Sequence, residues 1–533
     1  MTSSVASALK ERTESAQETQ EETTVMTARR PGRRAVMVSA VLTQLMIVLD
    51  LTIIAIALPR MQDDLGMTVS QSPWTVTGYS LAFGGLVLFG GRLCAVVGIR
   101  RSYQVGLIGF GIASLAAGMA TSFPILLVAR VAQGCFGALL APTSQSLLNV
   151  TFTERTERER VFAIFGATGG LGAAVGLLVG GALTDWISWR WALYINILLA
   201  TAALLIGQRS LPPADQRDHG SRITDDLTGL VLGCGACFSA VYGLDRAQQT
   251  SWTSTSTVSW LALGGIAAVL FVVRERFANR PVLPLSMMAL PVRAASYATQ
   301  FIAGAAQMGA IIYLTYYMQN HFGYSPFKSG VVFLPMVLAL IATAIPAGRV
   351  IVPRLGARGT LPLGLAVLTG SFLIFSRMTT QSSYSQVALP GLIVFGIGLG
   401  LTMPVTFNSG TRGVDAKRTG LASAILSAAQ QIGGSFGVAL MTSYATQHAE
   451  DYVAEHSEEV RAAAMEAMMR AQALPQSPAG KQIIEALKAQ LVDRAQIEAY
   501  AGGFTMMAWI LAGAGAALVA CGITLSVRRR RTR

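Results

Sequence analysis

Charged residues are scarce in this chain: they make up 13% of its 533 residues, against about 25% in soluble domains. Hydrophobic residues make up 52%, and the mean hydropathy is +0.50. This deficit excludes an ordinary soluble domain and indicates an integral membrane protein, with the lipid bilayer as a partner. The net charge of +13 does not indicate a nucleic-acid partner, because the basic residues lie in short loops and tails instead of on a basic helix.

Motifs for ATP use, hydrolysis and metal binding are also lacking. The chain has no GxxxxGK(S/T) phosphate loop, no HExxH, no GxSxG and no metal-ligand cluster. We therefore expect no enzyme activity, no metal and no cofactor, with a proton gradient as the energy source. Cys234 and Cys237 form a CxxC inside an apolar run, where helix packing explains them better than a zinc site of about four ligands.

Residues 1–34 are polar and lack the apolar core and cleavage site of a signal peptide, so we expect a disordered cytoplasmic tail. Beyond them, apolar runs recur fourteen times, each long enough to cross a bilayer as a helix. The runs are 35–58, 74–97, 103–121, 124–150, 161–183, 189–208, 227–246, 258–276, 294–318, 328–351, 360–378, 387–411, 420–446 and 500–526.

The distribution of Lys and Arg between these runs predicts an orientation. If residues 1–34 are cytoplasmic, most loop Lys and Arg and the basic tail 527–533 fall on the cytoplasmic side, as the positive-inside rule requires. We therefore expect a multi-pass cell-membrane protein with both termini cytoplasmic. The segment 447–499 then lies outside; we interpret it as a solvated helical cap broken near 475–478, with a substrate-capturing domain as the alternative.

Two similar loops indicate an internal repeat. GRLCAVVGIRR (91–101) and GRVIVPRLGAR (348–358) are both short, glycine-bounded and arginine-rich, and two related halves are a common plan of transporters. We predict an all-α polytopic membrane protein with six-helix bundles at 35–208 and 294–526. Two inserted helices with their linkers occupy 209–293.

Asp50 is the one acidic residue, of 28 in the chain, that lies well inside an apolar run. Placing a carboxylate in the bilayer costs roughly 2.5–3.5 kcal/mol, so an intramembrane acid is by default a functional hypothesis. The four histidines lie outside the runs. Asp50 is therefore the candidate for proton coupling.

Arg130 is the one basic residue well inside a run. At about 1.5 Å per residue, Asp50 and Arg130 lie roughly 12 and 9 Å from the outer face. Their matched depths allow an ion pair or a shared polar network. The alternative is a static ion pair that only holds the helices together.

Gly169, Gly172, Gly176 and Gly180 share one face of the fifth run, and glycines at this spacing let another helix approach closely. Two interpretations stay open: ordinary helix packing, or a sliding seam between the two half-bundles. The candidates for gating or packing are Gly91, Gly98, Arg101, Gly172, Gly176, Gly180 and Gly181.

Neutral polar and aromatic residues inside the runs suit a large, mostly apolar ligand that is held by few hydrogen bonds. For any one of them, hydrogen bonding between helices is the favoured alternative. The candidates for substrate binding are Gln133, Gln300, Gln307, Tyr313, Tyr317, Asn408, Gln430 and Gln431.

Four stretches, in this order along the chain, resemble motifs of the fourteen-helix drug:proton antiporters of the major facilitator superfamily. They are LDLTIIAIALP (49–59), RVAQGCFGA (130–138), GLLVGGALTDWISWRWALYIN (176–196) and GLAS…QQIGG (420–434). The resemblance implies the major facilitator fold and proton-driven export of hydrophobic or cationic compounds, often antibiotics, by alternating access. It also implies coupling roles for Asp50 and Arg130. We expect a monomer from a bacterium.

The chain departs from the family pattern at several positions. Ala95 stands where the family has an aspartate that latches the cytoplasmic gate, and Leu177 where it has a kink-favouring proline. Ala55 replaces an asparagine, and Val96 and Ile99 replace basic residues. Loss of a charge-assisted latch, worth about 1.5–3 kcal/mol, puts the gating balance in question more than the fold.

Three functions are weighed against each other. The favoured one is a proton-coupled exporter of hydrophobic or amphipathic small molecules. The second is a proton-coupled importer or exporter of another metabolite, which the response of accumulation to an uncoupler distinguishes. The third is a non-transporting membrane receptor or scaffold of the same fold, which predicts no substrate flux under any gradient.

Overall fold

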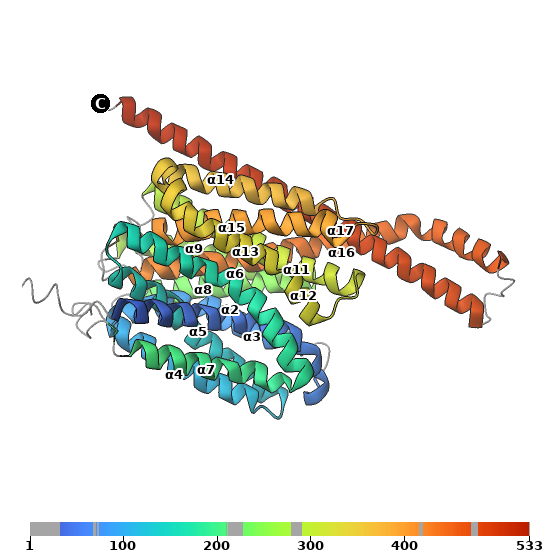
Figure 1. Ribbon diagram of the computed structural model, residues 1–533, viewed down its shortest axis with the longest axis horizontal. Helices are drawn as coiled ribbons and strands as arrows, with labels where there is room; N and C mark the ends of the chain where they lie inside the picture. Colours follow the sequence, from blue (N-terminus) through green and yellow to red (C-terminus); the bar gives the residue numbers. More distant parts are fainter. Residues whose placement is uncertain are drawn as a thin grey trace, which may run out of the picture.

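The computed structural model describes residues 32–67, 71, 74–208, 210–211, 227–278, 290–414, 419–470 and 478–531 (Figure 1). Their regular structure is helical. The N-terminal half comprises α2 (Gly32–Leu65), α3 (Trp74–Val97), α4 (Ile99–Gly118), α5 (Phe123–Thr151), α6 (Arg155–Trp186) and α7 (Trp189–Gly207). The predicted tail before residue 32 lies outside the described residues.

The chain continues through a helix pair into a C-terminal half. The pair is α8 (Leu227–Gln249) and α9 (Thr255–Phe277). The C-terminal half comprises α11 (Pro291–Tyr316), α12 (Pro326–Val332), α13 (Leu334–Pro346), α14 (Val352–Phe375), α15 (Leu389–Thr411), α16 (Thr419–Arg470) and α17 (Pro478–Arg531). Three π-helical turns join these helices: η2 (Tyr317–His321), η3 (Ala347–Ile351) and η4 (Tyr384–Ala388).

Each half has its own interior of buried side chains. In the N-terminal half, α2 packs on α6 and α7, and α5 packs on α3 and α4. In the C-terminal half, α11 packs on α16, α15 packs on α13 and α14, and α17 packs on α14 and α16. The pair α8 and α9 pack on each other, and α8 also contacts α3 and α16, so this pair lies against both halves. The division into domains predicted from the sequence stays a prediction.

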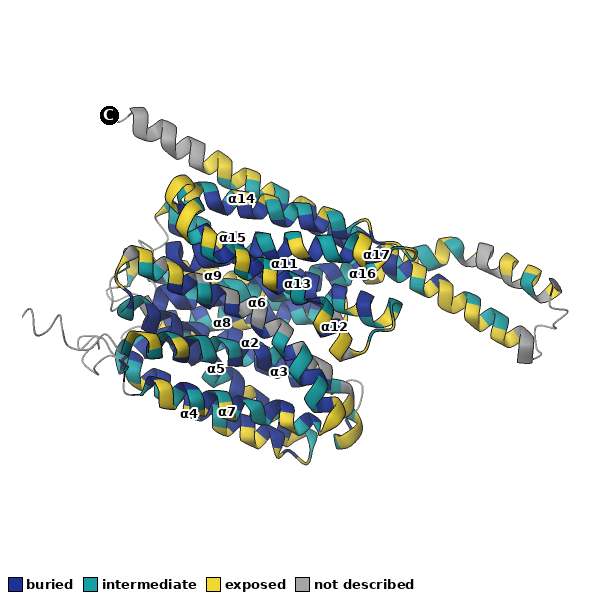
Figure 2. Ribbon diagram, viewed as in Figure 1, coloured by how far each residue is buried: buried dark blue, intermediate teal, exposed yellow. Residues whose placement is uncertain are grey.

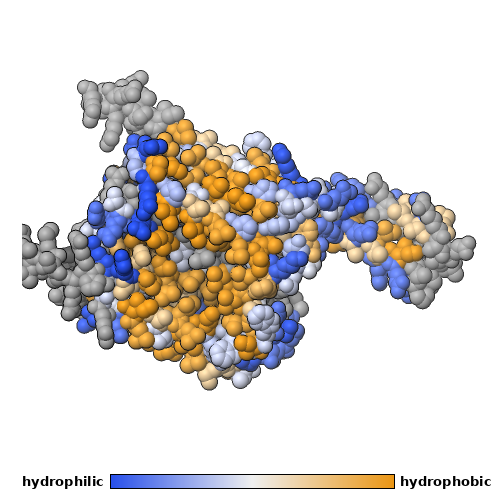
Figure 3. All heavy atoms as spheres, in the orientation of Figure 1, coloured by the Kyte–Doolittle hydropathy of each residue, from blue (hydrophilic) through white to orange (hydrophobic). Residues whose placement is uncertain are grey.

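The outer surface of the bundle is apolar. Figure 3 shows a broad hydrophobic band across the body, with hydrophilic residues towards its two ends, and Figure 2 places buried residues on the inner faces of the helices. Large side chains such as Ile112, Val128 and Leu198 are 63%, 70% and 67% exposed. An apolar surface this wide is unfavourable in water and is typical of contact with lipid.

Eleven helical stretches among the described residues are long and apolar enough to cross a membrane. The predicted count of fourteen is therefore not confirmed. Two predicted runs fall largely within the single stretch Phe327–Phe375, although the backbone turns between them at Gly356, where φ is +64°. Arg100 and Arg101 lie in the first turn of α4, which is not among the eleven.

Helices α16 and α17 extend well beyond the predicted apolar runs 420–446 and 500–526. The segment 447–499 is helical on both sides of the predicted break, since α16 continues to Arg470 and α17 begins at Pro478. The two helices project from the body side by side (Figure 1), and much of this projection is exposed (Figure 2). The alanine-rich sequence after residue 446 favours helix, whereas hydropathy marks only where the apolar run ends. Residues 475–477 of the predicted break lie outside the described residues.

Two sides of the bundle are named here. The basic side is where α2 begins and where Arg100, Arg354 and Arg412 lie; the hairpin side is where α16 and α17 project. The repeated loops 91–101 and 348–358 both lie on the basic side.

Gly98 and Gly356, one in each repeated loop, adopt φ values of +94° and +64°. Residues other than glycine rarely adopt such values. The two loops therefore turn by the same backbone device, as expected of related halves.

Candidate functional site

Asp50 lies in the middle of α2, fully buried, with its carboxylate turned into the N-terminal half. Its Oδ2 accepts a hydrogen bond of 2.6 Å from Nη1 of Arg130, and the two side chains have no exposed surface. Its Oδ1 accepts from Nδ2 of Asn196 at 2.7 Å and from Nε2 of Gln133 at 3.2 Å. The structure thus brings Asp50 and Arg130 together, as their matched depths allowed, and holds the carboxylate with three donors.

Arg130 is anchored by contacts beyond the carboxylate. Its Nε donates to the Thr75 carbonyl at 3.0 Å, and its Nη1 also donates to Oε1 of Gln133 at 2.9 Å. The guanidinium lies 4.6 Å from the ring centroid of Tyr79, which adds a cation–π contact in a desolvated setting. Arg130 is therefore fixed by α2, by α3 and by its own helix.

Helix geometry explains how the network is assembled. Arg130 and Gln133 lie three residues apart on α5, so both side chains leave the same face. Gly134 is on that side of α5 too, and a Cβ there would overlap the Tyr79 carbonyl of α3. This absence of a side chain lets α3 and α5 pack closely enough for Thr75 and Tyr79 to reach Arg130. Gln133 also donates to Ser114 of α4 at 2.7 Å.

The network is nearly, but not fully, satisfied. Nη2 of Arg130 and Oδ1 of Asn196 are buried and have no hydrogen-bond partner among the described residues. A buried ion pair is stable only when further hydrogen bonds offset its desolvation. Asp50 has them, so the geometry is that of an ionised carboxylate, whereas two spare polar atoms beside it remain for water or a rearranged partner.

Several members of this network had no role in the sequence prediction. Asn196 belonged to a motif but was given no function, and Ser114, Tyr79 and the Thr75 carbonyl were not singled out. Asn196 is a polar residue inside an apolar run, which is a usable signal. A backbone carbonyl at the start of a helix has no signature in the sequence.

The glycine face of α6 packs within the N-terminal half. A Cβ at Gly172 would meet Val48 at 3.0 Å, one at Gly180 would meet Ile53 at 2.9 Å, and one at Gly176 would overlap Oγ1 of Thr52. All three contacted residues belong to α2. In this conformation the three glycines therefore pack within their own half, against the helix that carries Asp50, and the sliding seam between half-bundles stays a prediction.

Of the remaining gating candidates, those of the loop 91–101 lie on the basic side, whereas Gly181 lies near the other end of α6. Gly91 is buried in α3, and Arg101 is exposed at the start of α4. Ala95 is partly buried near the end of α3. Gly181 is buried in α6.

The predicted substrate-binding residues do not form one cluster. Gln133 belongs to the Asp50 network. Tyr313 donates to Thr442 at 2.9 Å, and Tyr317 donates to the Thr379 carbonyl at 3.1 Å. Both tyrosines are core residues of the C-terminal half.

The other candidates lie nearer to the boundary between the halves. Gln300 accepts from Thr406 at 2.5 Å, and its Nε2 is buried without a partner, as are Oε1 of Gln307 and Oδ1 of Asn408. Gln430 approaches α11 through its backbone, and Gln431 lies near Gly84 of α3.

The two halves meet on the basic side through neutral groups. Nε2 of Gln145 on α5 donates to Ser427 of α16 at 3.1 Å, and Thr411 of α15 donates to Asn149 of α5 at 3.3 Å. Phe165 and Phe407 form an edge-to-face pair with centroids 5.9 Å apart. An apolar cluster surrounds them, drawn from both halves: Ala40, Leu148, Phe152, Val161, Phe162, Tyr297 and Leu426. This side of the boundary is closed.

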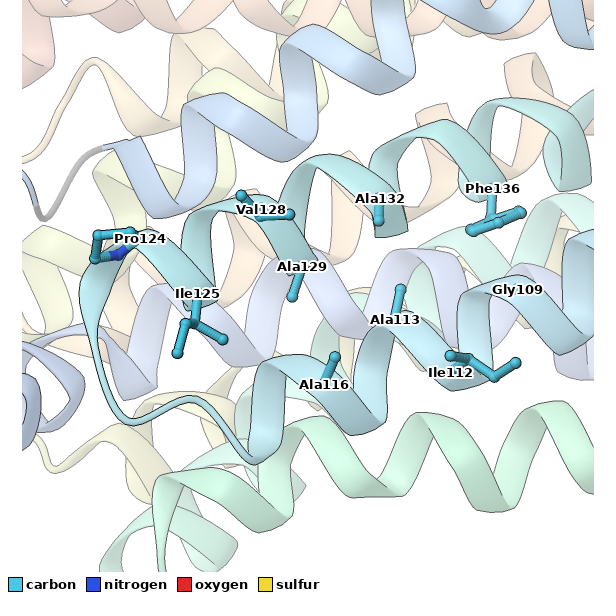
Figure 4. Close-up of a pocket in the computed structure, with 10 residues that line it drawn as sticks. All are labelled: Gly109, Ile112, Ala113, Ala116, Pro124, Ile125, Val128, Ala129, Ala132 and Phe136. Atoms are coloured by element: carbon cyan, nitrogen blue, oxygen red, sulfur yellow. The ribbon is translucent and has the colours of Figure 1, made fainter.

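A hollow of about 540 Å³ lies between α4 and α5. Figure 4 shows the ten side chains that line it, all of them small or apolar. Among them, Ile112, Ile125 and Val128 are strongly exposed on the outer surface. The hollow offers no hydrogen-bonding side chain, so it suits hydrocarbon and not a polar ligand group.

Comparison with known proteins identifies the family. The family model of the Major Facilitator Superfamily matches residues 40–438. The puromycin resistance protein pur8 of Streptomyces alboniger is 39% identical over 78% of this chain and 82% of its own length. The cephamycin export protein CmcT of Amycolatopsis lactamdurans is 33% identical over 76% and 83%. The tetracenomycin C resistance and export protein of Streptomyces glaucescens is 32% identical over 74% and 73%.

Solved structures show the same fold at low identity. The human organic anion transporter MFSD10 (TETRAN) superposes with a TM-score of 0.56 at 14% identity, over 91% of this chain and all of that one. A bacterial homologue of the human lysosomal transporter Spinster gives 0.54 at 15% identity, over 93% and 99%. With the family model matched over most of its length, the chain belongs to the major facilitator superfamily of membrane transporters.

Proposed function

We propose that this transporter exports hydrophobic or amphipathic small molecules, antibiotics among them, in exchange for protons. The observation that carries the proposal is the buried Asp50 carboxylate, paired with Arg130 and held by two neutral amides. Relatives named for resistance to puromycin and for export of cephamycin and tetracenomycin C support the substrate class. No cofactor is required, because the proton gradient supplies the energy.

Protonation of Asp50 is the proposed coupling step. A proton removes the charge that holds Nη1 of Arg130, and the guanidinium then keeps its neutral acceptors, the Thr75 carbonyl and Oε1 of Gln133. The hydrogen bond from Asn196 to the carboxylate weakens with the lost charge. α2 is thereby released from α5 and α7, and the balance between the two access states shifts. Release of the proton on the cytoplasmic side restores the pair.

The proposed topology follows the positive-inside rule. The fourteen apolar runs cross the cell membrane, with both termini and the basic side in the cytoplasm. The contacts around Phe165 and Phe407 then lie on the cytoplasmic side, and the contact of Trp186 on α6 with Phe327 on α12 lies towards the outer side. Two six-helix bundles with an inserted helix pair, acting as a monomer, complete the proposal.

Substitution of Asp50 tests the coupling step. Asp50→Asn keeps the shape of the side chain but cannot release a proton, so pH-gradient-driven ethidium efflux in everted vesicles should fall to the level of vesicles without the transporter. Because this change leaves Arg130 buried without a counter-charge, it can also destabilise the fold by about 3–5 kcal/mol. The double variant Asp50→Asn with Arg130→Gln removes both charges and controls for folding.

Retained proton-driven efflux in the folded double variant would show that the pair is only a static ion pair.

Growth of an efflux-deficient host on puromycin, lincomycin and tetracenomycin C gives the substrate range. An uncoupler should raise drug accumulation in cells that carry the wild type. A fall in accumulation would instead support an importer, and no flux under any gradient would support a receptor.

A further inference from the structure

Among the described residues, the helix pair α8 and α9 supplies none to the Asp50 network. α8 does contact α3, the helix that supplies Thr75 and Tyr79 to that network. α8 packs along α3, with apolar contacts such as that of Gly84 with Val241 and a polar contact at the first turn of α3. There Oδ1 of Asp245 accepts a hydrogen bond of 2.9 Å from Oγ1 of Thr77. Thr77 is only 7% exposed, so this polar contact is shielded from solvent.

An aromatic contact also joins α8 to the first turn of α3. The ring of Trp74, the first residue of α3, lies 6.3 Å from that of Tyr242 on α8. Tyr242 in turn packs edge-to-face on Trp260 of α9, with centroids 4.8 Å apart. Arg246 donates to the Tyr242 hydroxyl at 2.7 and 3.0 Å. Both inserted helices therefore help to hold the first turn of α3.

The same turn of α3 supplies a ligand to the coupling pair. The Thr75 carbonyl accepts from Nε of Arg130 at 3.0 Å, and Thr75 is fully buried. Thr75 and Thr77 are two residues apart, so a shift of this turn relative to α8 moves both. Arg130 then loses the contact that orients its guanidinium plane towards Asp50.

We propose that Asp245 is a positioning residue for proton coupling. By holding Thr77, it fixes the first turn of α3, and so the Thr75 carbonyl that aims Arg130 at Asp50. This assigns the inserted helix pair a role in coupling, beyond covering the boundary between the halves. The inference rests on the proposed function, since it concerns how well the pair responds to protons.

The test is a pH profile of transport for a matched set of variants. Thr77→Val removes the donor with little change in shape, and Asp245→Ala removes the acceptor. Each should move the midpoint of proton-driven efflux towards alkaline pH by about 0.5–1 unit, because a loosened Arg130 holds the carboxylate charge less well. The two changes combined should shift it no further than either alone. Asp245→Asn, which keeps an acceptor oxygen, should restore most of the wild-type profile.

Each alternative outcome has a meaning. Ser239→Ala, a buried change six residues earlier on α8, is the control and should leave the midpoint in place. If Thr77→Val is silent and Asp245→Asn stops efflux, Asp245 carries a proton itself and the positioning role is overturned. An unchanged profile in all variants, with coupled transport intact in the wild type, also overturns it. Absence of coupled transport in the wild type refutes the proposed function and not this inference in particular.

Discussion

At the scale of single residues, the Asp50–Arg130 pair is poorly explained as a source of stability. Desolvation of two charges often exceeds their mutual attraction, and well-packed apolar residues do as well or better. The pair nevertheless has three donors on the carboxylate, and three acceptors and one ring contact on the guanidinium. This arrangement suits a carboxyl group that alternates between a protonated and an ionised state and needs a fixed geometry in the ionised one.

A second charged contact, outside the membrane-spanning segments, gives a prediction about acid stability. Near the end of α2, Asp64 accepts from Nη1 of Arg190 at 2.5 Å and from the indole of Trp189 at 3.1 Å. The Arg190 hydrogen bond, followed by that of Trp189, lowers the pKa of the Asp64 carboxyl from 3.8. Because the folded pKa lies below the unfolded one, the contact stabilises the fold above about pH 3.8 and is lost as pH falls through the lowered pKa.

Asp64→Asn should therefore destabilise the purified protein at pH 7, and this difference from wild type should vanish in stronger acid. The Asp64 side chain is 45% exposed, so solvent screening limits the effect to about 0.2–1 kcal/mol. Thermal unfolding in detergent at a series of pH values measures it. Asp63→Asn, at the exposed neighbouring position, is the control. A difference that grows on acidification would contradict this account.

The sequence singles out the two charged residues of the site and, of its neutral side chains, only Gln133. Asp50 and Arg130 stand out because a charge inside an apolar run is costly and rare. Gln300, Tyr313 and Tyr317 are as polar and as deep, but depth does not say which way a side chain faces. The structure turns Tyr313 and Tyr317 into the core of one half, where threonine and backbone partners satisfy them.

At the scale of elements, the contact between α2 and α6 gives the next prediction. Gly176 faces Thr52, and a Cβ there has no room. Gly176→Ala should destabilise the protein by about 1–3 kcal/mol, as overpacking does. Gly370→Ala on α14 is the matched control, because nothing lies within 4 Å of the added Cβ, and alanine stabilises a helix by up to about 1 kcal/mol relative to glycine.

Thermal unfolding of both variants in detergent measures these effects, and expression at the membrane gives a second reading. Equal stability of the two alanine variants would show that α2 and α6 are less closely packed than the structure has them. Thr52 is two residues after Asp50 on α2, so a shift of α2 at Thr52 also displaces Asp50. Gly176→Ala should therefore also reduce transport, whereas Gly370→Ala should not.

Helix ends show why sequence patterns have limits at this scale. Hydropathy located the apolar runs, because burial in lipid selects for them. It marks where α16 and α17 leave the apolar layer but not where they end, since a helix continues into water wherever its residues favour helix and no glycine or proline interrupts it. The eleven apolar stretches among the described residues differ from fourteen runs partly because the stretch Phe327–Phe375 covers most of two runs, which the turn at Gly356 separates.

At the scale of the whole molecule, the repeated loops predict two related halves, a division that stays a prediction, but they do not predict which side chains join the halves. That depends on contacts between residues far apart in the chain, such as Gln145 with Ser427 and Phe165 with Phe407. These contacts also concern Ala95, which stands where the family pattern has an aspartate. On the basic side, neutral hydrogen bonds and an apolar cluster join the halves.

This closure can be tested by cross-linking across the boundary. Nε2 of Gln145 and Oγ of Ser427 lie 3.1 Å apart, so cysteines at these two positions lie within reach of a short bifunctional thiol reagent. In a background without the native cysteines Cys94, Cys135, Cys234, Cys237 and Cys521, the pair Gln145→Cys with Ser427→Cys should be cross-linked by a short bis-methanethiosulfonate, whose disulfide links can be reduced. Because alternating access requires this side to open, the cross-link should stop efflux, and reduction should restore it.

The matched control is a pair of cysteines within one half. A Cβ at Gly32 would lie 3.1 Å from Cβ of Ser210, so Gly32→Cys with Ser210→Cys should cross-link as readily on the same side of the membrane. Its efflux should persist, since both positions move together with the N-terminal half. Full efflux by the cross-linked Gln145→Cys, Ser427→Cys protein would mean that the halves do not separate there. The apolar cluster around Phe165 and Phe407 would then be a fixed hinge and not a gate.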